Sequence, residues 1–328
     1  MHLSRSLSFL SAWKWLIPDP RQSEVLPNMP EVPTLTKNAR EMTRITSEQL
    51  DQFVAESDRL GGPENPETKE YWKDFEYVPK VTVDKSLDPF GNEYLNQQLI
   101  LYTEISGRTL NQKENEYAHF DLNKHIAARN PYDRIMPPTS LALHLTRLCL
   151  ALRIANKPRG AKLLDMGCGW GLSSELGSYL GFEVHALDIN RDFTRLVDER
   201  SRRLNLGIKV IHSSFDDFVT EEKFDIVLFY ECLHHAVTPW TLLENMARIL
   251  VNKGKIVICG EPINEFWWPT WGMRLDPLSV YCVRKFGWFE SGWSQGFILR
   301  CLDRALLNST FVPPIDPEVG PIIIADKD

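Results

Sequence analysis

The sequence lacks the features that would assign this protein to an oxidising compartment or to a membrane. Only six cysteines occur among 328 residues and none form a CxxC pair, which argues against both a disulfide framework and a zinc cluster. No uninterrupted apolar run approaches the length that spans a bilayer, and no small-residue cleavage site follows the first apolar stretch. We therefore expect a cytoplasmic protein without stable membrane insertion.

The sequence also lacks an excess of positive charge. Its formal net charge is −7, which argues against a broad phosphate-binding surface, so we expect no nucleic-acid partner. A local basic pocket for an anionic small molecule remains open. With 43% hydrophobic residues, the chain can form one α/β domain with a full core and an appendage.

Changes in composition divide the chain into three parts. Residues 1–40 are rich in Pro and Ser, which predicts a poorly ordered segment. Residues 41–136 are expected to form a mainly helical accessory or lid region, with one helix over 46–60, capped by Ser47, and a second over 93–105. Residues 61–92 alternate between turn signals and short extended pieces, and the sequence does not define the order of these elements. Residues 137–328 are expected to form the principal domain.

The principal domain alternates between short apolar runs and amphipathic segments. A helix over 141–155 precedes this alternation. Strands are expected at 162–166, 183–188, 209–213, 225–230 and 255–260, and helices at 172–180, 192–204 and 239–250, the last ended by Gly254. This order predicts an α/β fold with a doubly wound, mostly parallel sheet. Ligands of such sheets bind beyond the carboxyl ends of the strands.

A glycine-rich turn follows the first of these strands. Gly167, Gly169 and Gly171 form G-x-G-x-G just before a helix, where a Cβ would block close approach of a ligand. Dinucleotide-binding enzymes share this motif, so an NAD-dependent reductase is one alternative. Asp165, however, would attract a sulfonium or an amino group and repel a pyrophosphate. Asp188 ends the second strand, where a carboxylate can accept hydrogen bonds from a ribose diol.

With these residues the sequence resembles the class I S-adenosylmethionine-dependent methyltransferase superfamily. LLDMGCGWG, VHALDIN and FDIVLFYECLHH are similar to three of its motifs, in order, between residues 163 and 258. The resemblance implies a Rossmann-like sheet of seven strands that ends in an antiparallel pair, at 311–313 and 322–325. It also implies that S-adenosylmethionine contacts a set of residues around the turn and the strand ends: Asp165, Gly167, Cys168, Gly169, Gly171, Asp188, Ile189 and Tyr230.

One stretch departs from the pattern of the superfamily. Its members usually carry an aspartate after the third strand that binds the adenine amino group, and Ser214 stands at that position here. Ser214, Phe215 or Asp216 can supply the contact, and the sequence does not choose among them.

Candidate catalytic residues follow the fourth and fifth strands. Methyl transfer to a hydroxyl needs alignment and a base with a pKa near neutrality, which favours histidine. His234 and His235 follow the fourth strand, and Glu261 follows the fifth. We expect His235 to act as the base and Glu261 to orient it, with His234 as the alternative base. A metal held by these three residues would need further ligands, so we expect none.

An aromatic-rich insert occupies residues 264–296. Its tryptophans and cations suit a substrate with a ring and a negative group, and we expect Trp271, Arg274 and Arg284 to bind substrate. A hydrophobic cap or a homodimer surface is the alternative.

The acceptor is expected to be a small molecule or a sugar methylated on oxygen. Carbon and nitrogen acceptors, the reductase, and a non-catalytic binding module with a methyltransferase-like fold remain alternatives.

Overall fold

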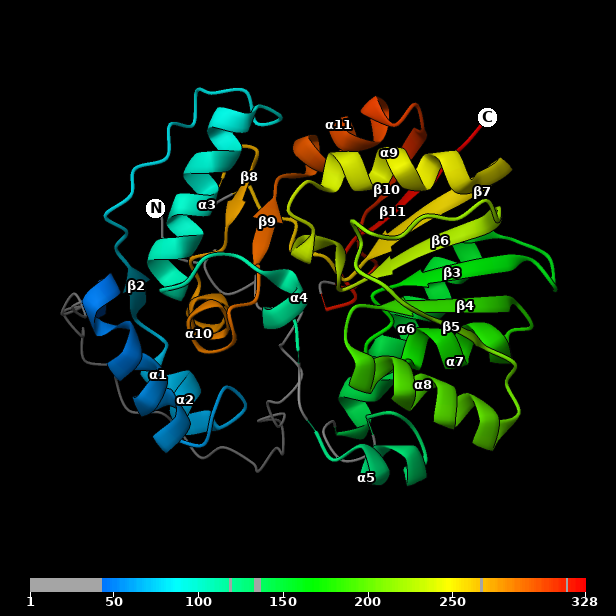
Figure 1. The fold of residues 1–328 in the computed structure, drawn as a ribbon, viewed down its shortest axis with the longest axis horizontal. Helices are drawn as coiled ribbons and strands as arrows, with labels where there is room; N and C mark the ends of the chain where they lie inside the picture. Colours follow the sequence, from blue (N-terminus) through cyan, green and yellow to red (C-terminus); the bar gives the residue numbers. More distant parts are fainter. Residues whose placement is uncertain (1–42, 118–119, 133–136, 266–267, 317) are drawn as a thin grey trace, which may run out of the picture.

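The computed structural model describes residues 43–117, 120–132, 137–265, 268–316 and 318–328. The segment 1–40 predicted to be poorly ordered lies outside these residues. At the centre is a seven-stranded sheet with the order β10-β11-β7-β6-β3-β4-β5 (Figure 1). Its strands are β3 (Lys162–Met166), β4 (Glu183–Asp188), β5 (Lys209–His212), β6 (Phe224–Tyr230), β7 (Leu250–Cys259), β10 (Asn308–Val312) and β11 (Ile322–Asp326).

Five neighbouring strands of the sheet are parallel, from β7 through β6, β3 and β4 to β5. Strand β11 runs antiparallel to both β7 and β10. The mostly parallel, doubly wound α/β sheet of seven strands is thus confirmed, including the antiparallel pair at its end. Because the carboxyl ends of β3, β4, β6 and β7 meet along one edge, the loops after these strands lie together.

Helices cover both faces of the sheet. One apolar core includes residues of α6 (Pro138–Ala155), α7 (Leu172–Tyr179) and α8 (Arg191–Leu204), and the other includes α9 (Pro239–Ile249) and α11 (Gln295–Arg304). Successive strand residues contribute to opposite cores, as Leu163 and Leu164 of β3 do, because side chains alternate along a strand. This arrangement buries both faces of the sheet and leaves its carboxyl edge for a ligand.

The N-terminal helices and the aromatic-rich insert pack together beside the sheet (Figure 1). The insert contains β8 (Trp271–Met273), α10 (Pro277–Phe286) and β9 (Ser291–Trp293). Against it lie elements of the N-terminal region, which are β1 (Thr43–Ile45), η1 (Ser47–Gln49), α1 (Leu50–Arg59), α2 (Pro66–Tyr71), β2 (Phe75–Tyr77) and α3 (Asn92–Ser106). The hydroxyl of Tyr102 on α3 donates to the carbonyl of Gly287 at 2.7 Å. Two further short helices, α4 (Gln112–Asn115) and α5 (Leu122–Ala127), lead toward the principal domain.

Local details differ from the sequence-based expectations at two points. Thr46, not Ser47, caps the first helix, because its backbone N–H donates to the Gln49 side chain at 2.9 Å in a capping box. Gly254 does not end a helix: α9 ends at Ile249, and Gly254 lies within β7. A Cβ on Gly254 would lie 2.8 Å from the Val251 carbonyl oxygen, so glycine permits the irregular start of this strand.

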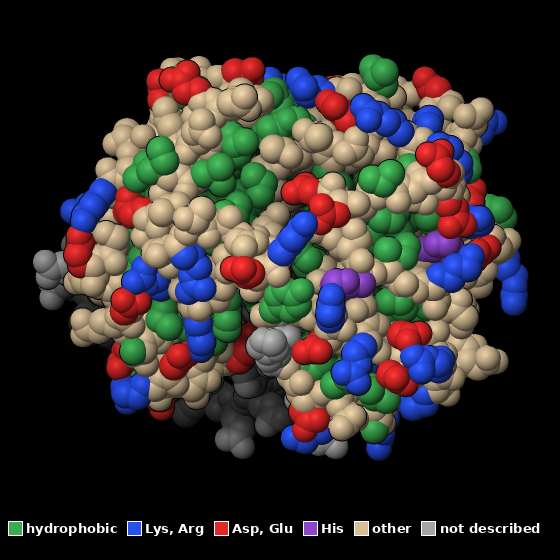
Figure 2. Space-filling view, viewed as in Figure 1, with side chains coloured by type: hydrophobic (Ala, Val, Ile, Leu, Met, Phe, Trp, Pro, Cys, Tyr) green, Lys and Arg blue, Asp and Glu red, His purple; other side chains and the backbone are tan. Residues whose placement is uncertain are grey.

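The described surface carries charged side chains of both signs. Acidic and basic side chains are interspersed over the face seen in Figure 2, without a broad basic patch. Among the described helices, no apolar stretch is long enough to cross a bilayer.

Candidate active site

The glycine-rich turn leaves open space in front of its backbone. Gly167 and Gly169 have φ angles of +64° and +48°, in the left-handed region that favours glycine. A Cβ on Gly167 would lie 2.8 Å from Cβ of Cys232, so this glycine lets the turn pack against the residues after β6. A Cβ on Gly169 would meet no described atom within 4 Å. The space beside Gly169 can therefore hold a ligand against the backbone.

Asp165, near the end of β3, is fully buried below this turn. Its Oδ2 atom accepts hydrogen bonds from Ser173 and Ser174, whereas Oδ1 has no hydrogen-bond partner among the described residues. Burial raises the pKa of Asp165 to about 6, although the two serine hydroxyls lower it. A buried carboxylate with an unpaired oxygen gains if a cationic group binds to it, so Asp165 fits the amino group of S-adenosylmethionine.

Asp188, at the end of β4, is held by two backbone N–H groups. Gly169 donates to its Oδ2 at 2.9 Å and Asn190 donates to its Oδ1 at 2.8 Å. Burial raises the pKa of Asp188, while these two donors and the charge of His235 lower it. The carboxylate is thus fixed beside the open space at Gly169, where its remaining lone pairs can accept hydrogen bonds from two ribose hydroxyls.

The expected adenine contacts lie in the turn after β5. The Ser214 hydroxyl donates to Asp217 at 2.7 Å, so this side chain is engaged within the turn. The ring of Phe215 packs near Gly167, 3.3 Å from the position of a Cβ there, and Asp216 is exposed. Ile189 is half-buried directly after Asp188. Phe215 and Ile189 therefore provide apolar surface near the turn, and the adenine assignment stays a prediction.

Two of the residues expected to contact the cofactor are buried and hydrogen-bonded to neighbouring residues of the protein. Cys168 is buried, and its N–H donates to the carbonyl of Leu187 at 2.9 Å. Tyr230 is 8% exposed and its hydroxyl is bonded to His144 of α6. For both residues the contacts observed here hold the ends of β3 and β6 in place.

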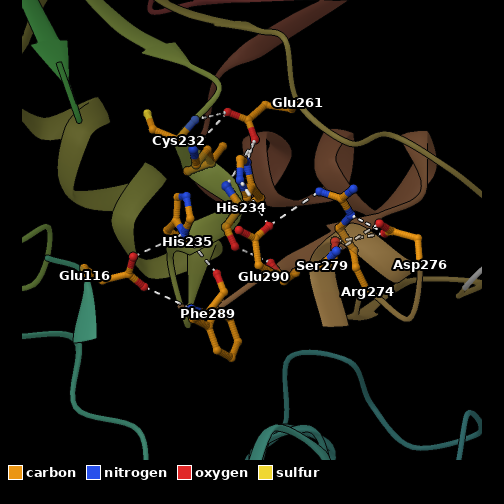
Figure 3. Close-up of polar contacts among 12 residues, drawn as sticks. Glu116, Cys232, His234, His235, Glu261, Arg274, Asp276, Ser279, Phe289 and Glu290 are labelled. Atoms are coloured by element: carbon orange, nitrogen blue, oxygen red, sulfur yellow. Dashed lines mark hydrogen bonds and ion pairs between the residues drawn. The ribbon is translucent and has the colours of Figure 1, made fainter. Parts of the chain in front are cut away.

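His234 and His235 lie on the single-turn helix η2 (Leu233–His235), which follows β6. Glu261 was expected to orient His235, but the structure places it against His234: Nδ1 of His234 lies 2.9 Å from Oε2 of Glu261 (Figure 3). Glu261 also accepts the backbone N–H groups of Cys232, Leu233 and His234. Burial raises its pKa, but His234 and these donors hold it below its ordinary value. Glu261 thus fixes the shape of η2. The expectation that Glu261 orients His235 is wrong.

His235 has different partners. Its Nδ1 atom lies 3.1 Å from the carbonyl oxygen of Phe289 and 3.5 Å from Oε2 of Glu116 (Figure 3). A carbonyl oxygen only accepts, so Nδ1 carries the proton and Nε2 is left as the acceptor. The His235 side chain is 24% exposed against 8% for His234. His235 is therefore the more accessible of the two candidate bases.

Sequence reasoning missed Glu116, Phe289 and Glu290. Glu116 comes from the N-terminal region, and Oε2 of Glu290 in the insert lies 3.7 Å from Nε2 of His234. No motif marks these residues, because their contacts join segments that are distant in the sequence.

The three residues of the insert that we expected to bind substrate lie in different surroundings. Trp271 is 1% exposed, packs against Trp240 and Phe297, and donates its indole N–H to the carbonyl of Pro89 at 2.7 Å. Because its ring is enclosed and its N–H is paired, Trp271 is a core residue rather than a substrate contact. Arg284 is also misassigned: its Nε and Nη2 atoms each donate to Asp51 on α1 at 2.7 Å, and its Nη1 atom donates to the carbonyl of Ile105 at 3.5 Å.

Arg274 lies closer to the histidines. Its Nε donates to Asp276 at 3.1 Å, and its Nη1 lies 3.5 Å from Oε2 of Glu290 (Figure 3). The side chain is almost fully buried, so Arg274 supports Glu290 and His234 from within the insert.

One group of side chains near η2 has the spacing of a metal site. One ring nitrogen each of His234 and His235 and a carboxylate oxygen of Glu290 lie within 4.8 Å of one another. Arg274, however, already supplies a positive charge to Glu290. We interpret the group as a cluster of opposite charges, in which Oε2 of Glu290 lies 3.7 Å from Nε2 of His234. The expectation that no metal binds stays a prediction.

Residues 164–258 match a protein-family model described as a methyltransferase domain. The match begins in β3 and ends in β7, so it includes the glycine turn, Asp188 and both histidines. Residues 164–258 are therefore similar to methyltransferase domains, which agrees with the resemblance of the motifs to the class I S-adenosylmethionine-dependent superfamily.

Curated relatives are similar to this chain over the same domain. It is 31% identical over 153 residues to a ubiquinone biosynthesis O-methyltransferase from Xanthomonas axonopodis pv. citri, covering 44% of this chain and 62% of the relative. It is 33% identical over 125 residues to the protein of that name from Xanthomonas euvesicatoria pv. vesicatoria, covering 37% and 48%. The chain thus spans about half the length of the curated relatives it matches.

A solved structure of magnesium protoporphyrin IX methyltransferase from Synechocystis, with S-adenosylmethionine bound, is also similar. It is 13% identical, with a TM-score of 0.46, over 67% of this chain and 99% of that chain. A likeness at this level carries no functional argument.

Proposed function

We propose that this protein transfers a methyl group from S-adenosylmethionine to an oxygen atom of a small molecule or sugar. The observation that carries the proposal is the meeting of Asp165, Gly169, Asp188 and His235 at one edge of the sheet. At this edge, the buried carboxylate of Asp165 can bind a cation, and the backbone at Gly169 is open to a ligand. The carboxylate of Asp188 can bind hydroxyls, and His235 is an accessible base. The name O-methyltransferase carried by the relatives supports the choice of oxygen.

The residues around the glycine turn hold the cofactor in this proposal. Asp165, whose Oδ1 atom has no partner among the described residues, would hold the amino group, and Asp188 would hold the ribose hydroxyls. When bound, S-adenosylmethionine supplies a methyl carbon already activated by the sulfonium. The protein then has two tasks, which are to align the acceptor with that carbon and to remove the acceptor's proton.

His235 removes the proton. With its Nδ1–H directed to the Phe289 carbonyl, neutral His235 presents Nε2 as the acceptor of the hydroxyl proton. His234, tied to Glu261 and more deeply buried, keeps η2 in shape. The half-buried ring of Trp288 lies beside His235, with ring centroids 6.2 Å apart, and forms an apolar wall for the acceptor.

Three features of the wider protein belong to the same proposal. Residues 41–136 serve as a lid region that completes the site, the protein works in the cytoplasm, and it can associate as a homodimer. Cell fractionation and sedimentation equilibrium test the last two.

Methyl-labelled cofactor tests the proposal. The protein is incubated with labelled S-adenosylmethionine and a panel of probes, namely catechol, a methyl glycoside and aniline, and the products are read by mass spectrometry. We expect label on oxygen of catechol or the glycoside, with binding of S-adenosylhomocysteine but not NADH in calorimetry. Label on aniline nitrogen would contradict the choice of oxygen. NADH binding without S-adenosylhomocysteine binding would favour a reductase, and cofactor binding without turnover would favour a binding module.

A further inference from the structure

Glu116 reaches the proposed base from outside the domain that matches the methyltransferase model. Its side chain is 11% exposed, and its two oxygens have separate contacts. Oε1 accepts the backbone N–H of Phe289 at 3.0 Å, and Oε2 lies 3.5 Å from Nδ1 of His235 (Figure 3). The same residue of the insert, Phe289, accepts from His235 through its carbonyl. Each of Glu116, Phe289 and His235 therefore contacts the other two.

The position of Glu116 is fixed by α4, which immediately precedes it. Gln112 donates to the backbone carbonyl of His235 at 2.6 Å, and Asn115 donates to the hydroxyl of Tyr102 at 3.3 Å. Lys113 lies 2.7 Å from Asp217, in the turn after β5. This short helix thus contacts η2, α3 and the turn after β5, and Glu116 is presented to His235 by contacts on several sides.

Several charged groups surround His235. Burial lowers its pKa, but Glu116, Glu290 and Glu261 together raise the pKa above its ordinary value, and Asp188 lies close enough to interact with it. Glu261 is bonded to His234, and Glu290 is paired with Arg274. Among these acids, Glu116 does most to raise the pKa of His235. Burial raises the pKa of Glu116 itself above its ordinary value, although His235 and the N–H of Phe289 lower it.

We propose that Glu116 is a positioning residue for methyl transfer: with the Phe289 carbonyl it keeps the proton on Nδ1 of His235 and stabilises the imidazolium that forms there. The inference rests on the proposed function, in which His235 is the base. In the step itself, the acceptor's O–H bond breaks as its proton moves to Nε2 of His235. The oxygen–carbon bond forms as the carbon–sulfur bond breaks, and sulfur keeps the electron pair. The imidazolium afterwards releases its proton to solvent.

Three variants distinguish the effect of the negative charge of Glu116 from the effect of its side-chain shape. Glu116→Gln keeps the size of the side chain and an acceptor for the Phe289 N–H but removes the negative charge. Glu116→Asp keeps the charge on a shorter side chain. Glu114→Gln removes an equal charge from α4 at an exposed position and serves as the matched control.

The decisive measurement is the NMR titration of isotope-labelled histidines in the full chain saturated with S-adenosylhomocysteine, with His235→Asn used to assign the signal. We expect the titration of His235 to move to lower pH by about one to two units in Glu116→Gln, because an opposite charge at this distance favours the imidazolium. Glu116→Asp should restore most of the shift, and Glu114→Gln should leave it unchanged. An unchanged titration in Glu116→Gln, or an equal shift in Glu114→Gln, would overturn the proposal.

Kinetics with catechol as the probe acceptor gives the second readout. Glu116→Gln should lower kcat about 10- to 100-fold, and the rising limb of its pH profile should move to lower pH, with KM for S-adenosylmethionine changed by less than about twofold. A structural role alone would not move that limb. Unchanged kcat despite a shifted titration would overturn the positioning role. Absence of methyl transfer to any hydroxyl probe by the wild type, together with the shifted titration, would contradict the proposed function and leave the Glu116–His235 pair standing.

Discussion

Oε2 of Glu261 lies 2.9 Å from Nδ1 of His234 and accepts the backbone N–H of the same residue at 3.1 Å. The carboxylate after β7 therefore binds the first histidine of the pair and leaves the second to other partners. This division gives the two adjacent histidines different partners. His234 is part of the framework of η2, and His235 faces the site with one ring nitrogen available.

Replacing Glu261 by Gln should destabilise the protein. The amide nitrogen cannot accept, so donors of η2 lose a buried partner, which costs about 1–3 kcal/mol of unfolding free energy. Urea unfolding measures the change, with the exposed Glu265→Gln as control. If stability is unchanged while methyl transfer falls sharply, Glu261 acts in the chemistry and the framework role is wrong.

Replacing Asp188 by Ala should weaken cofactor binding. Two ribose hydroxyls lose their acceptor, and the N–H of Gly169 loses its partner, so we expect binding of S-adenosylhomocysteine to weaken by about 1–3 kcal/mol. Isothermal calorimetry provides the measurement. Equal affinity in wild type and variant would remove Asp188 from the ribose site.

Cofactor binding should release protons near pH 6. The pKa of Asp165 is about 6 in the absence of ligand, so this carboxyl is partly protonated there. An amino cation bound at Oδ1 favours the ionised form, and affinity should therefore fall as the pH drops below 6. Calorimetry of S-adenosylhomocysteine in buffers of different protonation enthalpy counts the protons. Release that persists in Asp165→Asn would assign the protons to another group.

Replacing Trp271 by Ala should affect folding rather than substrate affinity. Its ring is enclosed by Tyr94, Trp240 and Phe297, so the cavity should cost about 3–5 kcal/mol. Chemical denaturation measures this cost, and Arg284→Ala, which loses a surface pair with Asp51, should cost less than about 1 kcal/mol. A stable Trp271→Ala variant with a raised acceptor KM would restore the substrate-binding hypothesis.

The fold was predictable because inner strands of the sheet, such as β3 and β6, are short apolar runs bounded by turn residues. The positions of the glycine turn and Asp188 were predictable for a related reason, since each lies at the end of a strand. Their part in cofactor binding stays a prediction. The start of β7 was misassigned because Gly254, normally a helix stop, sits in a strand irregularity that only tertiary pairing defines.

The candidate site was predictable only in part. His234, His235 and Glu261 follow neighbouring strands, so their proximity could be expected, but the pairing between them depends on the turn of η2. Glu116 and Phe289 lie 173 positions apart, and no local pattern predicts a contact of that kind. Trp271 was misassigned because a tryptophan in an insert has the same sequence signature in a core and in a substrate pocket.

The central claim is that His235 removes the acceptor's proton during methyl transfer from S-adenosylmethionine. The most direct test is kcat for transfer of a labelled methyl group to catechol by the wild type and by His235→Ala, with S-adenosylhomocysteine affinity measured alongside. We predict that kcat falls about 10²–10⁴-fold in the variant while cofactor affinity is preserved, the usual contribution of a general base. A kcat close to that of the wild type in His235→Ala would contradict the account.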